Sequence, residues 1–343
     1  MTRVFGWDLG GANVKLACVE DGRVLQVVQI PCPITPERRK FDAAVDASLP
    51  LISSPALHAV TMTGELSDVF NDRAEGVAYL IELMRKAAAD QTLRVYAGSA
   101  GFLVPDDAKG RTLEVASANW HATAALIARH HPNALLVDVG TTTTDLIPIT
   151  GGAVTARGAT DAERLTETEL LYTGVVRTPV MAVARTAPFR GRTQGIAAER
   201  FATMADVWRL TGDLPDDADP YPTADQRGKS GPESAARLAR MLGRDASEGG
   251  LGEWVALARY FAECQLVEIE DAGRGLAARD ALLPSAPVVG AGCGRFVAKA
   301  VAERLGRPYL DFADSIDAAP EAREMAACCA PAVGVALLAG NGG

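Results

Sequence analysis

A short apolar run near the middle of the chain leads into an aspartate and a polar turn. Ala134–Val137 is followed by Asp138 and then by Gly140–Thr143, and a second apolar run covers Leu146–Ile149. Apolar runs of this length, bounded by glycine, are typical of buried strands rather than helices. The turn between them predicts a tight hairpin whose N–H groups and hydroxyls could surround phosphate oxygens. An ordinary hairpin with capping Asp and Thr residues is the structural alternative.

The same pattern occurs near the start of the chain. There Val4–Trp7 leads into Asp8 and the turn Gly10–Asn13, and Val14–Val19 forms the second apolar run. The two aspartates are 130 positions apart, so the repeat predicts a duplicated domain. Two such turns facing each other would hold a chain of phosphates, and the aspartates would offer the oxygen ligands that Mg²⁺ prefers.

The rest of the chain is a mixture of predicted strands and helices. Strands are expected at 57–63 and 93–98, a β-rich patch at 174–183, and helices at 118–130, 233–242 and 252–278. Residues 213–232 contain several aspartates among prolines and glycines, which predicts a long loop. Such a loop could be a lid or a mobile, solvated excursion. The apolar segment 321–339 predicts one buried helix with a kink at Pro331.

Composition narrows the classes of function. The chain has 343 residues, of which 48% are hydrophobic and 22% charged, as in ordinary soluble proteins. Its net charge of −9 argues against nucleic acid as a partner, since that would need a basic surface. The longest apolar run is too short for a membrane span, and no signal peptide is expected, so we expect a cytoplasmic protein. The six cysteines lack metal-ligand spacing and are expected to be free thiols.

Further motifs give the two turns a family context. They are Met62–Leu66, Ser117–Trp120, Tyr172–Gly174 with Arg177–Pro179, Ala224–Lys229 and Pro287–Gly294. With the two turns they resemble the sugar kinase, Hsp70 and actin superfamily, and within it the hydantoinase/oxoprolinase-like branch. The resemblance implies an α/β fold of two duplicated ribonuclease H-like (actin-like ATPase) domains that face a central cleft. We therefore expect an N-terminal domain over 1–133, with helix 321–339 packed back on it, and a C-terminal domain over 134–320.

Within that branch the motifs are most similar to those of the enzymes of methanofuran and methylofuran biosynthesis. This resemblance implies a transferase that joins an aminomethylfuran-methyl diphosphate to the phenol of a (γ-glutamyl)tyramine or tyrosine-type acceptor and releases diphosphate. Its partners would be these small molecules rather than nucleic acid or membranes, and its cofactor would be Mg²⁺. The sequence does not indicate an oligomeric state.

The resemblance and the motifs together suggest which residues act. Diphosphate binding is expected from Gly10, Gly11, Ala12, Asn13, Gly140, Thr141, Thr142 and Thr143. Catalytic roles are expected for Asp8, Lys15, Glu65 and Asp138. The expected metal ligands are Asp8, Asp138 and Asp145. Substrate contacts are expected from Asn119, Trp120, Arg177, Gly290 and Gly292.

Each of these residue types has a chemical reason and a structural alternative. Lys15 would place a compact positive charge on a phosphate, or it is an exposed strand lysine. Glu65 follows a predicted strand, where α/β sheets place their sites, and could act as a base. Trp120 would form an aromatic wall for a furan or phenol ring, or it packs in the core. Arg177 would bind a carboxylate or phosphate through its planar guanidinium, or it forms a surface ion pair. Asp145 could simply stabilise its hairpin.

Two other classes of function stay open. The same two turns could hold ATP, as in an ATP-dependent small-molecule kinase or an ATPase-coupled hydrolase of the hydantoinase/oxoprolinase type. They could also serve a nucleotide-sensing switch without catalysis. The motif Gly290–Gly294 departs from the plain double glycine that is common in kinases, which favours the transferase.

Overall fold

The computed structural model describes residues 3–32, 37–52 and 55–340. The chain forms two compact units. The first combines Met1–Leu136, Ile147–Glu169 and Leu310–Gly343, and the second combines Val137–Leu146 and Leu170–Tyr309. The expected domains, 1–133 with the returning helix 321–339 and 134–320, have different bounds from these units, because the chain passes between the units several times.

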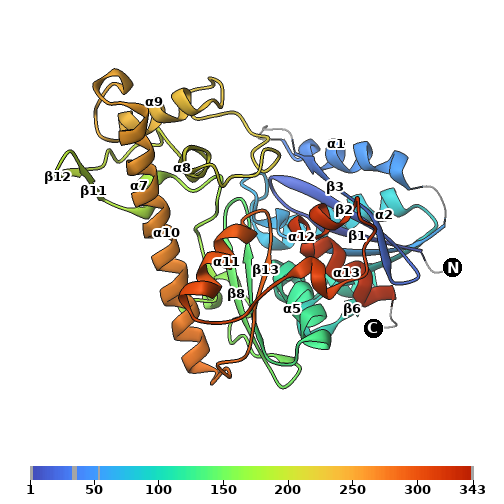
Figure 1. Ribbon diagram of the computed structural model, residues 1–343. Coiled ribbons are helices and arrows are strands. Elements are labelled where there is room, and N and C mark those ends of the chain that lie inside the picture. The colour runs from blue at the N-terminus through green and yellow to red at the C-terminus, as the bar shows by residue number, and fades with distance from the viewer. Residues whose placement is uncertain (1–2, 33–36, 53–54, 341–343) are drawn as a thin grey trace. The chain divides into compact units, whose positions relative to one another are not determined.

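A six-stranded sheet with the order β3-β2-β1-β4-β5-β6 forms the centre of the first unit (Figure 1). Its strands are β1 (Arg3–Leu9), β2 (Asn13–Glu20), β3 (Arg23–Pro31), β4 (Leu57–Met62), β5 (Thr92–Tyr96) and β6 (Phe102–Leu103). β1 pairs with β2, and β2 with β3, in antiparallel register, whereas β4 runs parallel to both β1 and β5. The carboxyl ends of β1 and β4 therefore lie at the same edge of the sheet, which is where α/β folds place their sites.

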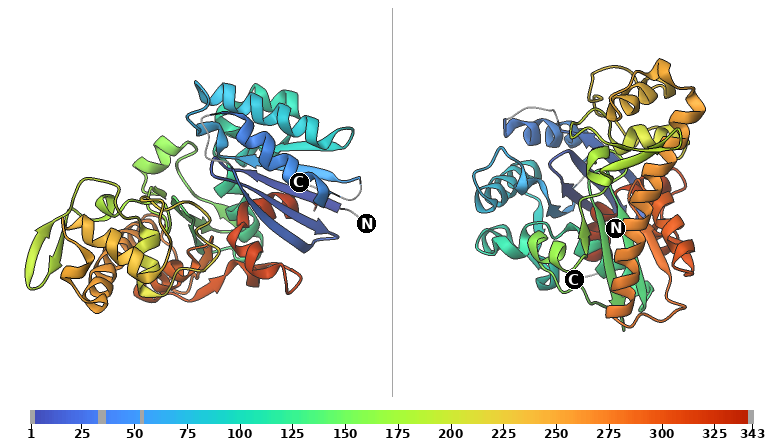
Figure 2. Two further views of the ribbon diagram at one scale, coloured as in Figure 1. Left: turned by 90° about the horizontal axis from the view of Figure 1, so that it is seen from above. Right: turned by 90° about the vertical axis from the view of Figure 1, so that its left-hand side faces the viewer.

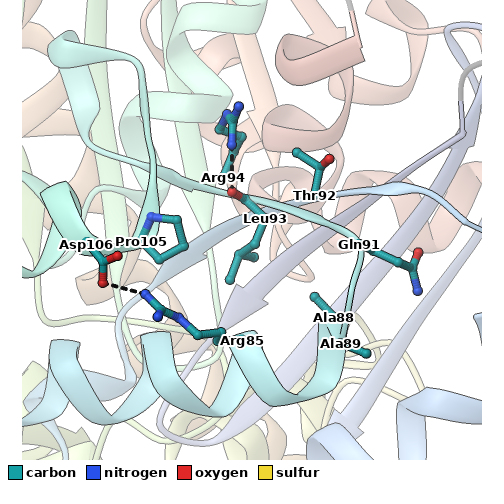
Figure 3. Close-up of a pocket in the computed structure, with 9 residues that line it drawn as sticks. All are labelled: Arg85, Ala88, Ala89, Gln91, Thr92, Leu93, Arg94, Pro105 and Asp106. Carbon is teal, nitrogen blue, oxygen red and sulfur yellow. Dashed lines mark hydrogen bonds and ion pairs between the residues drawn. The ribbon is translucent and has the colours of Figure 1, made fainter.

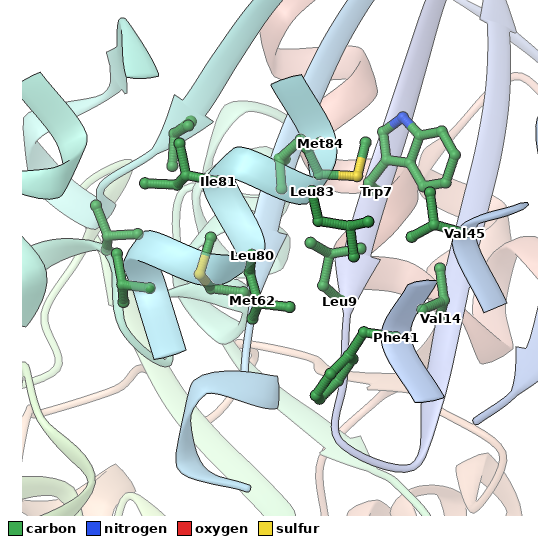
Figure 4. Close-up of a cluster of buried hydrophobic side chains, with 14 of the residues drawn as sticks. Trp7, Leu9, Val14, Phe41, Val45, Met62, Leu80, Ile81, Leu83 and Met84 are labelled. Atoms are coloured by element: carbon green, nitrogen blue, oxygen red, sulfur yellow. The ribbon is translucent and has the colours of Figure 1, made fainter. Parts of the chain in front are cut away.

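Helices cover both faces of this sheet. The helices of the first unit are α1 (Arg39–Ser48), α2 (Arg73–Ala88), α3 (Pro105–Lys109), α4 (Thr112–Val115), α5 (Asn119–His130), α6 (Asp161–Thr166), α12 (Arg323–Cys328) and α13 (Ala330–Gly340). On one face, Trp7 and Leu9 of β1 pack in a core with Phe41 of α1 and Leu80 of α2 (Figure 4). Because side chains alternate along a strand, Gly6 lies on the other face, against α13. Burial on both faces explains why the central strands β1 and β4 are buried along nearly their whole length.

A second sheet repeats this arrangement. Its order is β10-β8-β7-β13-β14, with β9 also paired to β8. The strands are β7 (Ala134–Val139), β8 (Thr144–Thr150), β9 (Ala153–Val154), β10 (Leu170–Leu171), β13 (Val288–Ala291) and β14 (Tyr309–Asp311). β7, β8, β9 and β13 occupy the places that β1, β2, β3 and β4 hold in the first sheet. The duplicated α/β fold that the two turns predicted is confirmed by this match. The predicted cleft between the two domains stays a prediction.

The second unit adds a group of helices beyond its sheet. They are α7 (Val180–Val183), α8 (Met204–Thr211), α9 (Gly231–Met241), α10 (Leu251–Arg279) and α11 (Arg295–Arg304). α10 is the long helix that packs against α8, α9 and α11 (Figures 1 and 2). A separate two-stranded sheet pairs β11 (Thr186–Phe189) with β12 (Arg192–Gly195). The helices predicted at 233–242 and 252–278 correspond to α9 and α10.

The predicted β-rich patch at 174–183 is wrong. In this stretch the structure has a turn and the short helix α7 rather than a strand. The reason is that its backbone pairs with the polar turn after β7: the N–H of Val175 donates to the Gly140 carbonyl at 3.1 Å, and that of Val176 donates to the Thr141 carbonyl at 3.2 Å. Apolar residues here therefore support a loop instead of joining a ladder.

The predicted single helix at 321–339 is two helices, α12 and α13. Pro331 is the second residue of α13, where the missing N–H removes no helical hydrogen bond. Every residue from Ala330 to Leu338 is buried, as expected for a helix that is apolar all round. α13 packs against β1, with Ala332 and Ala336 directly over Gly6. Among the helices in the described part of the chain, none has the length and apolar character needed to cross a membrane.

Gly6 is the position at which this packing is most sensitive to substitution. A Cβ atom on Gly6 would lie 2.0 Å from the Ala332 carbonyl oxygen and 2.7 Å from the Ala336 Cβ. We expect Gly6→Ala to lower the free energy of unfolding by about 1–3 kcal/mol or more, because α13 must move away from β1. Equilibrium urea denaturation of the purified protein measures this change.

Gly275→Ala is the matched control. Gly275 lies exposed within α10, and a Cβ there meets no atom within 4 Å. We expect this substitution to raise the free energy of unfolding by about 0.5–1 kcal/mol, since alanine loses less backbone entropy in a helix. A Gly6→Ala protein as stable as the wild type would contradict the close packing of α13 on β1.

Candidate functional site

The turn between β1 and β2 is a tight loop closed by its own backbone. The Gly10 N–H donates to the Asn13 carbonyl at 3.0 Å, and the Ala12 carbonyl accepts from the Cys32 N–H at 2.9 Å. Asp8 and Lys15 are opposite each other in the antiparallel register, and Lys15 Nζ lies 2.9 Å from Asp8 Oδ2. The lysine that the sequence assigned to a phosphate thus neutralises the carboxylate beside the turn.

Buried oxygen atoms without partners gather around this turn. Asp8 Oδ1, Asn13 Oδ1 and Thr61 Oγ1 have no hydrogen-bond partner among the described residues. Asp8 and Thr61 are direct neighbours in the parallel register of β1 and β4, and Asp8 is 1% exposed. Unpaired buried acceptors are costly, so a native structure that retains several of them in one place is set up for a further group.

The donor set fits Mg²⁺ that keeps most of its water. All three unpaired atoms are oxygens, which a hard cation prefers, and one of them is a carboxylate oxygen. In the portion of the chain that the structure describes, no group of three or more His, Cys, Asp or Glu residues could enclose a metal. A magnesium ion here would therefore be bound by few protein ligands together with substrate oxygens and water.

The turn between β7 and β8 in the second unit has the same closure. Its Gly140 N–H donates to the Thr143 carbonyl at 2.9 Å, matching the bond from Gly10 to Asn13. The segment after β10 hydrogen-bonds to this turn, since its Arg177 N–H donates to the Thr141 carbonyl at 2.8 Å. The Thr144 hydroxyl in turn donates to the Thr173 carbonyl at 2.5 Å. The two predicted phosphate turns are thus the same local structure.

The third glycine motif lies directly against Asp138. Gly292 has a φ of +83°, and a Cβ on it would lie 2.5 Å from Asp138 Oδ1 and 2.2 Å from the Val139 carbonyl oxygen. The Gly294 N–H donates to that same carbonyl at 2.8 Å. Gly290 instead faces the ring of Tyr309. Gly292 is therefore needed both for its left-handed backbone and for the close approach to Asp138.

Asp145 lies in β8, the strand next to the β7 that carries Asp138. It is partly buried in β8, paired in register with Leu170 of β10. The structure thus groups Asp138, Gly140–Thr143, Arg177 and Gly292 within the second unit, and Asp8, Lys15, Gly10–Asn13 and Glu65 within the first. Whether these two groups converge on one ligand stays a prediction.

Glu65 is a buried carboxyl in the first unit. It lies in a short 3-10 helix, Gly64–Leu66, that follows β4, and it is 1% exposed. Burial raises the pKa of the Glu65 carboxyl to about 7, against opposing hydrogen bonds that include the Ser117 hydroxyl. The Ser117 hydroxyl donates to Glu65 Oε1 at 3.0 Å. A carboxyl with a pKa in this range can accept or give a proton near neutral pH.

Trp120 and Asn119 begin helix α5. The Asn119 side chain accepts from the Trp120 N–H at 2.8 Å, and Trp120 is 6% exposed. The guanidinium carbon of Arg164 lies 4.1 Å from the centre of the Trp120 ring, so one ring face is already covered. Trp120 Nε1 has no hydrogen-bond partner among the residues described. An indole N–H that is buried in this way is unusual and remains able to donate to a ligand.

The long loop at 213–232 is anchored by ion pairs. Arg237 of α9 is completely buried and bonds to Asp206 of α8 at 2.8 Å and to Asp225 of the loop at 3.1 Å. Arg209 binds Asp219 of the same loop at 2.7 Å. The loop is therefore an ordered part of the second unit, and sequence reasoning missed these arginines because their partners are distant in the chain.

The anchored loop also reaches the predicted substrate residue Arg177. The guanidinium carbon of Arg177, which is exposed, lies 5.9 Å from the ring centre of Tyr221 in the loop. This is the range of a cation–π contact. Tyr221 is thus a neighbour of Arg177 that the sequence did not single out, since nothing in its local pattern indicates this contact.

A pocket of about 400 Å³ lies elsewhere in the first unit (Figure 3). It is lined by residues from the end of α2, from β5 and from the start of α3, with an ion pair between Arg85 and Asp106 at its rim. None of the residues that line it belongs to the two turns or neighbours Glu65. We do not assign the chemistry to this pocket, because its walls carry no unpaired buried polar group.

Comparisons with known proteins bear on the family of the chain. The family model described as Hydantoinase/oxoprolinase matches residues 56–319. A protein of Methanocaldococcus jannaschii is 33% identical over 243 residues, covering 71% of this chain and 72% of that protein. A protein of Methanococcus vannielii is 32% identical over 126 residues, covering 37% of this chain and 56% of that protein. Both are named (4-{4-[2-(gamma-L-glutamylamino)ethyl]phenoxymethyl}furan-2-yl)methanamine synthase.

A solved structure is similar in fold. The nucleotide-free structure of acetone carboxylase superposes with a TM-score of 0.55 at 11% identity, covering 89% of this chain and 67% of that chain. At this identity the likeness concerns the fold alone. The extent of the family match and the identity to the Methanocaldococcus protein together decide the assignment. The chain belongs to the hydantoinase/oxoprolinase family.

Proposed function

We propose that this protein is a transferase of methanofuran or methylofuran biosynthesis. It would join an aminomethylfuran-methyl diphosphate to the phenol of a γ-glutamyltyramine, tyramine or tyrosine-type acceptor, forming an aryl ether and releasing diphosphate. The observation that carries the proposal is the 33% identity to a synthase whose name describes a phenoxymethyl-furan product. Such a product contains the ether bond between a phenol oxygen and a furan methylene carbon.

The paired turns supply what this reaction needs most. A furan methylene carbon loses its leaving group readily, so the main task is to stabilise the negative charge that develops on the departing diphosphate. The turns at Gly10–Asn13 and Gly140–Thr143 would present backbone N–H groups and hydroxyls to it. Preorganised donors of this kind are usually the largest catalytic contribution, with one donor worth roughly 3–4 kcal/mol.

Asp8, Asp138 and Asp145 would hold magnesium beside the diphosphate. The unpaired oxygens of Asp8, Asn13 and Thr61 support this assignment in the first unit. When bound, Mg²⁺ neutralises phosphate charge. Lys15, which pairs with Asp8, would add a compact positive charge to the diphosphate site.

The acceptor must lose a proton to become a good nucleophile. A phenol has an unperturbed pKa of about 10, so at neutral pH a base adds roughly 10²–10⁴-fold to the rate. Glu65 suits this role because burial raises the pKa of its carboxyl to about 7. Arg177 and Trp120 would contact the substrates, and the backbone of Gly292 packs closely against Asp138.

The aspartates provide the first test. Asp8→Asn and Asp138→Asn should each lower turnover by at least about 10²-fold while the fold is retained, since each removes a charge from the diphosphate site. Steady-state kinetics measures the loss, and thermal unfolding checks the fold. Asp90→Asn and Asp213→Asn, at exposed positions in the first and second units, are the matched controls and should behave as wild type. Full activity in either site variant would remove the paired-turn mechanism.

The substrates provide the second test. Incubation with the furan diphosphate and tyramine or γ-glutamyltyramine should yield an ether product and free diphosphate, detected by mass spectrometry. Calorimetric titration with Mg·ATP should show no appreciable binding. Micromolar affinity for Mg·ATP together with no ether product would favour the ATP-dependent kinase or hydrolase instead.

The buried carboxyl gives a prediction on stability that does not depend on activity. Because its pKa is raised from 4.5 to about 7, Glu65 contributes stability that is complete below about pH 4.5 and lost as the pH rises through about 7. Over this window the loss is up to about 3 kcal/mol. Glu65→Gln, which is neutral throughout, should therefore be more stable than wild type above pH 7 and similar near pH 4.5. Urea denaturation at several pH values measures the difference, and parallel curves for the two proteins would contradict it.

A further inference from the structure

Glu65 and Ser117 form a buried, hydrogen-bonded pair in the first unit. Glu65 is 1% exposed and Ser117 is 6% exposed. The Ser117 hydroxyl donates a hydrogen bond to Glu65 Oε1 at 3.0 Å, and Glu65 Oε2 has no hydrogen-bond partner among the described residues. A carboxyl with only structural duties would be expected to satisfy both oxygens, since an unpaired buried acceptor destabilises the fold.

The backbone around the pair is constrained as well. Ser117 has a φ of +53°, in the left-handed region that a non-glycine residue adopts only at a cost. Across from it, α2 approaches so closely that a Cβ on Gly76 would lie 2.6 Å from the Glu65 Cα. Two separate segments thus fix the position of the hydroxyl and of the carboxyl. Strain that persists beside an unpaired buried group is typical of functional sites.

The pair lies at the edge of the sheet that carries the first phosphate turn. Leu9 is opposite Met62 in the register of β1 and β4, and Met62 forms a parallel bridge with Ala116. Neighbouring strands are about 4.8 Å apart, so Ser117 is roughly 10 Å from the turn after β1, two strands along the same edge. A small substrate whose diphosphate lies on that turn would have its reacting carbon between the two.

We propose that Ser117 contacts the phenol of the acceptor and relays its proton to Glu65. This inference rests on the proposed function and deepens it, because it names the group that the acceptor meets. Ser117 is the more exposed member of the pair, at 6% against 1% for Glu65. The Ser117 hydroxyl is already aligned for transfer, since its proton points at Glu65 and its lone pairs remain for the phenol.

The phenol proton moves to Ser117 Oγ while the Ser117 proton moves to Glu65 Oε1. The phenolate oxygen forms a bond to the furan methylene carbon as the bond from that carbon to diphosphate breaks, and diphosphate leaves with the electron pair. Glu65 later releases the proton to solvent by the reverse path through Ser117, so no oxidant or further reactant is required.

The charged surroundings of Glu65 are compatible with this role. Asp161, at the start of α6, acts on the carboxyl electrostatically and raises its pKa, in the same direction as burial. Glu75, on the helix packed against Glu65, pairs with Arg38 and is directed at Asn71 rather than at the site. Glu65 acts on the acceptor only through Ser117, so its role is tested by the pH dependence of kcat, which a purely structural role would not change.

The experiment compares variants with acceptors of different acidity. Full-length wild type, Ser117→Gly and Glu65→Gln are assayed with the furan diphosphate and either tyramine or ring-fluorinated tyramine, whose phenol is more acidic. Glycine accepts the left-handed backbone of position 117 without strain, so this variant removes only the hydroxyl. Thr123→Val is the matched control, because it also deletes a buried hydroxyl, on the neighbouring helix α5. Unlike the Ser117 hydroxyl, the Thr123 hydroxyl has no hydrogen-bond partner among the described residues.

The relay predicts a specific set of results. With tyramine, Ser117→Gly and Glu65→Gln should each lower kcat by about 10²–10⁴-fold, leave KM for the furan diphosphate unchanged, and recover most of the loss with the fluorinated acceptor. Wild type should lose activity as the pH falls below about 7, and Glu65→Gln should lack this dependence. Thr123→Val should match wild type throughout.

Three outcomes would overturn the relay. Wild-type kcat and pH profile in Ser117→Gly would exclude it while leaving the proposed function intact. An equal loss with both acceptors would assign the pair a structural role. Absence of ether product from wild type in the same assay would instead reject the proposed function and the relay with it. If Ser117→Gly does not fold, the pH profiles of Glu65→Gln and Glu65→Asp decide between the first two outcomes.

Discussion

The fold depends on a carboxylate placed at the end of a buried strand, directly before a turn that closes on its own backbone. In the first sheet Asp8 is followed by a turn closed from Gly10 to Asn13, and in the second Asp138 is followed by one closed from Gly140 to Thr143. Burying a charge is unfavourable unless something compensates it. Lys15 compensates Asp8 in the first unit, and in the second unit the backbone of Gly292 packs closely against Asp138.

Much of the surrounding structure serves to keep these aspartates and turns in place. α13 covers the face of β1 opposite the main core, which is possible only because Gly6 has no side chain there. In the second unit the segment around Val175–Arg177 gives its backbone hydrogen bonds to the second turn instead of to a strand. Arg237 anchors the long loop, and this loop brings Tyr221 to Arg177. Packing and ion pairs thus limit the freedom of residues next to both turns.

The proposed chemistry divides between charge stabilisation and proton transfer. The turns suit diphosphate, because oxygen-rich anions are held by N–H groups, lysine and a hard cation. The buried pair of Glu65 and Ser117 suits a phenol, because a carboxyl shielded from water holds a proton at a higher pH than an exposed one. Both features occur at the carboxyl ends of adjacent strands in the first sheet, so one substrate could meet them together.

The sequence by itself determined the duplicated strand–Asp–turn pattern, the main helices and the family. These features are local: strand and turn signals lie within about twenty residues, and apolar periodicity is visible in a single segment. The prediction of a β-rich patch at 174–183 was wrong because the backbone of this segment hydrogen-bonds to a distant partner, the Gly140–Thr143 turn.

Only the tertiary structure decided how residues far apart in the chain meet. The pairing of Glu65 with Ser117, the unpaired oxygen of Thr61 beside Asp8, the contact of Gly292 with Asp138 and the anchoring of Asp225 by Arg237 all join distant segments. Local pattern cannot indicate such contacts, because they arise from register between non-consecutive strands and from burial. Burial also sets the ionisation of Glu65, since removal from water rather than residue type raises the pKa of its carboxyl.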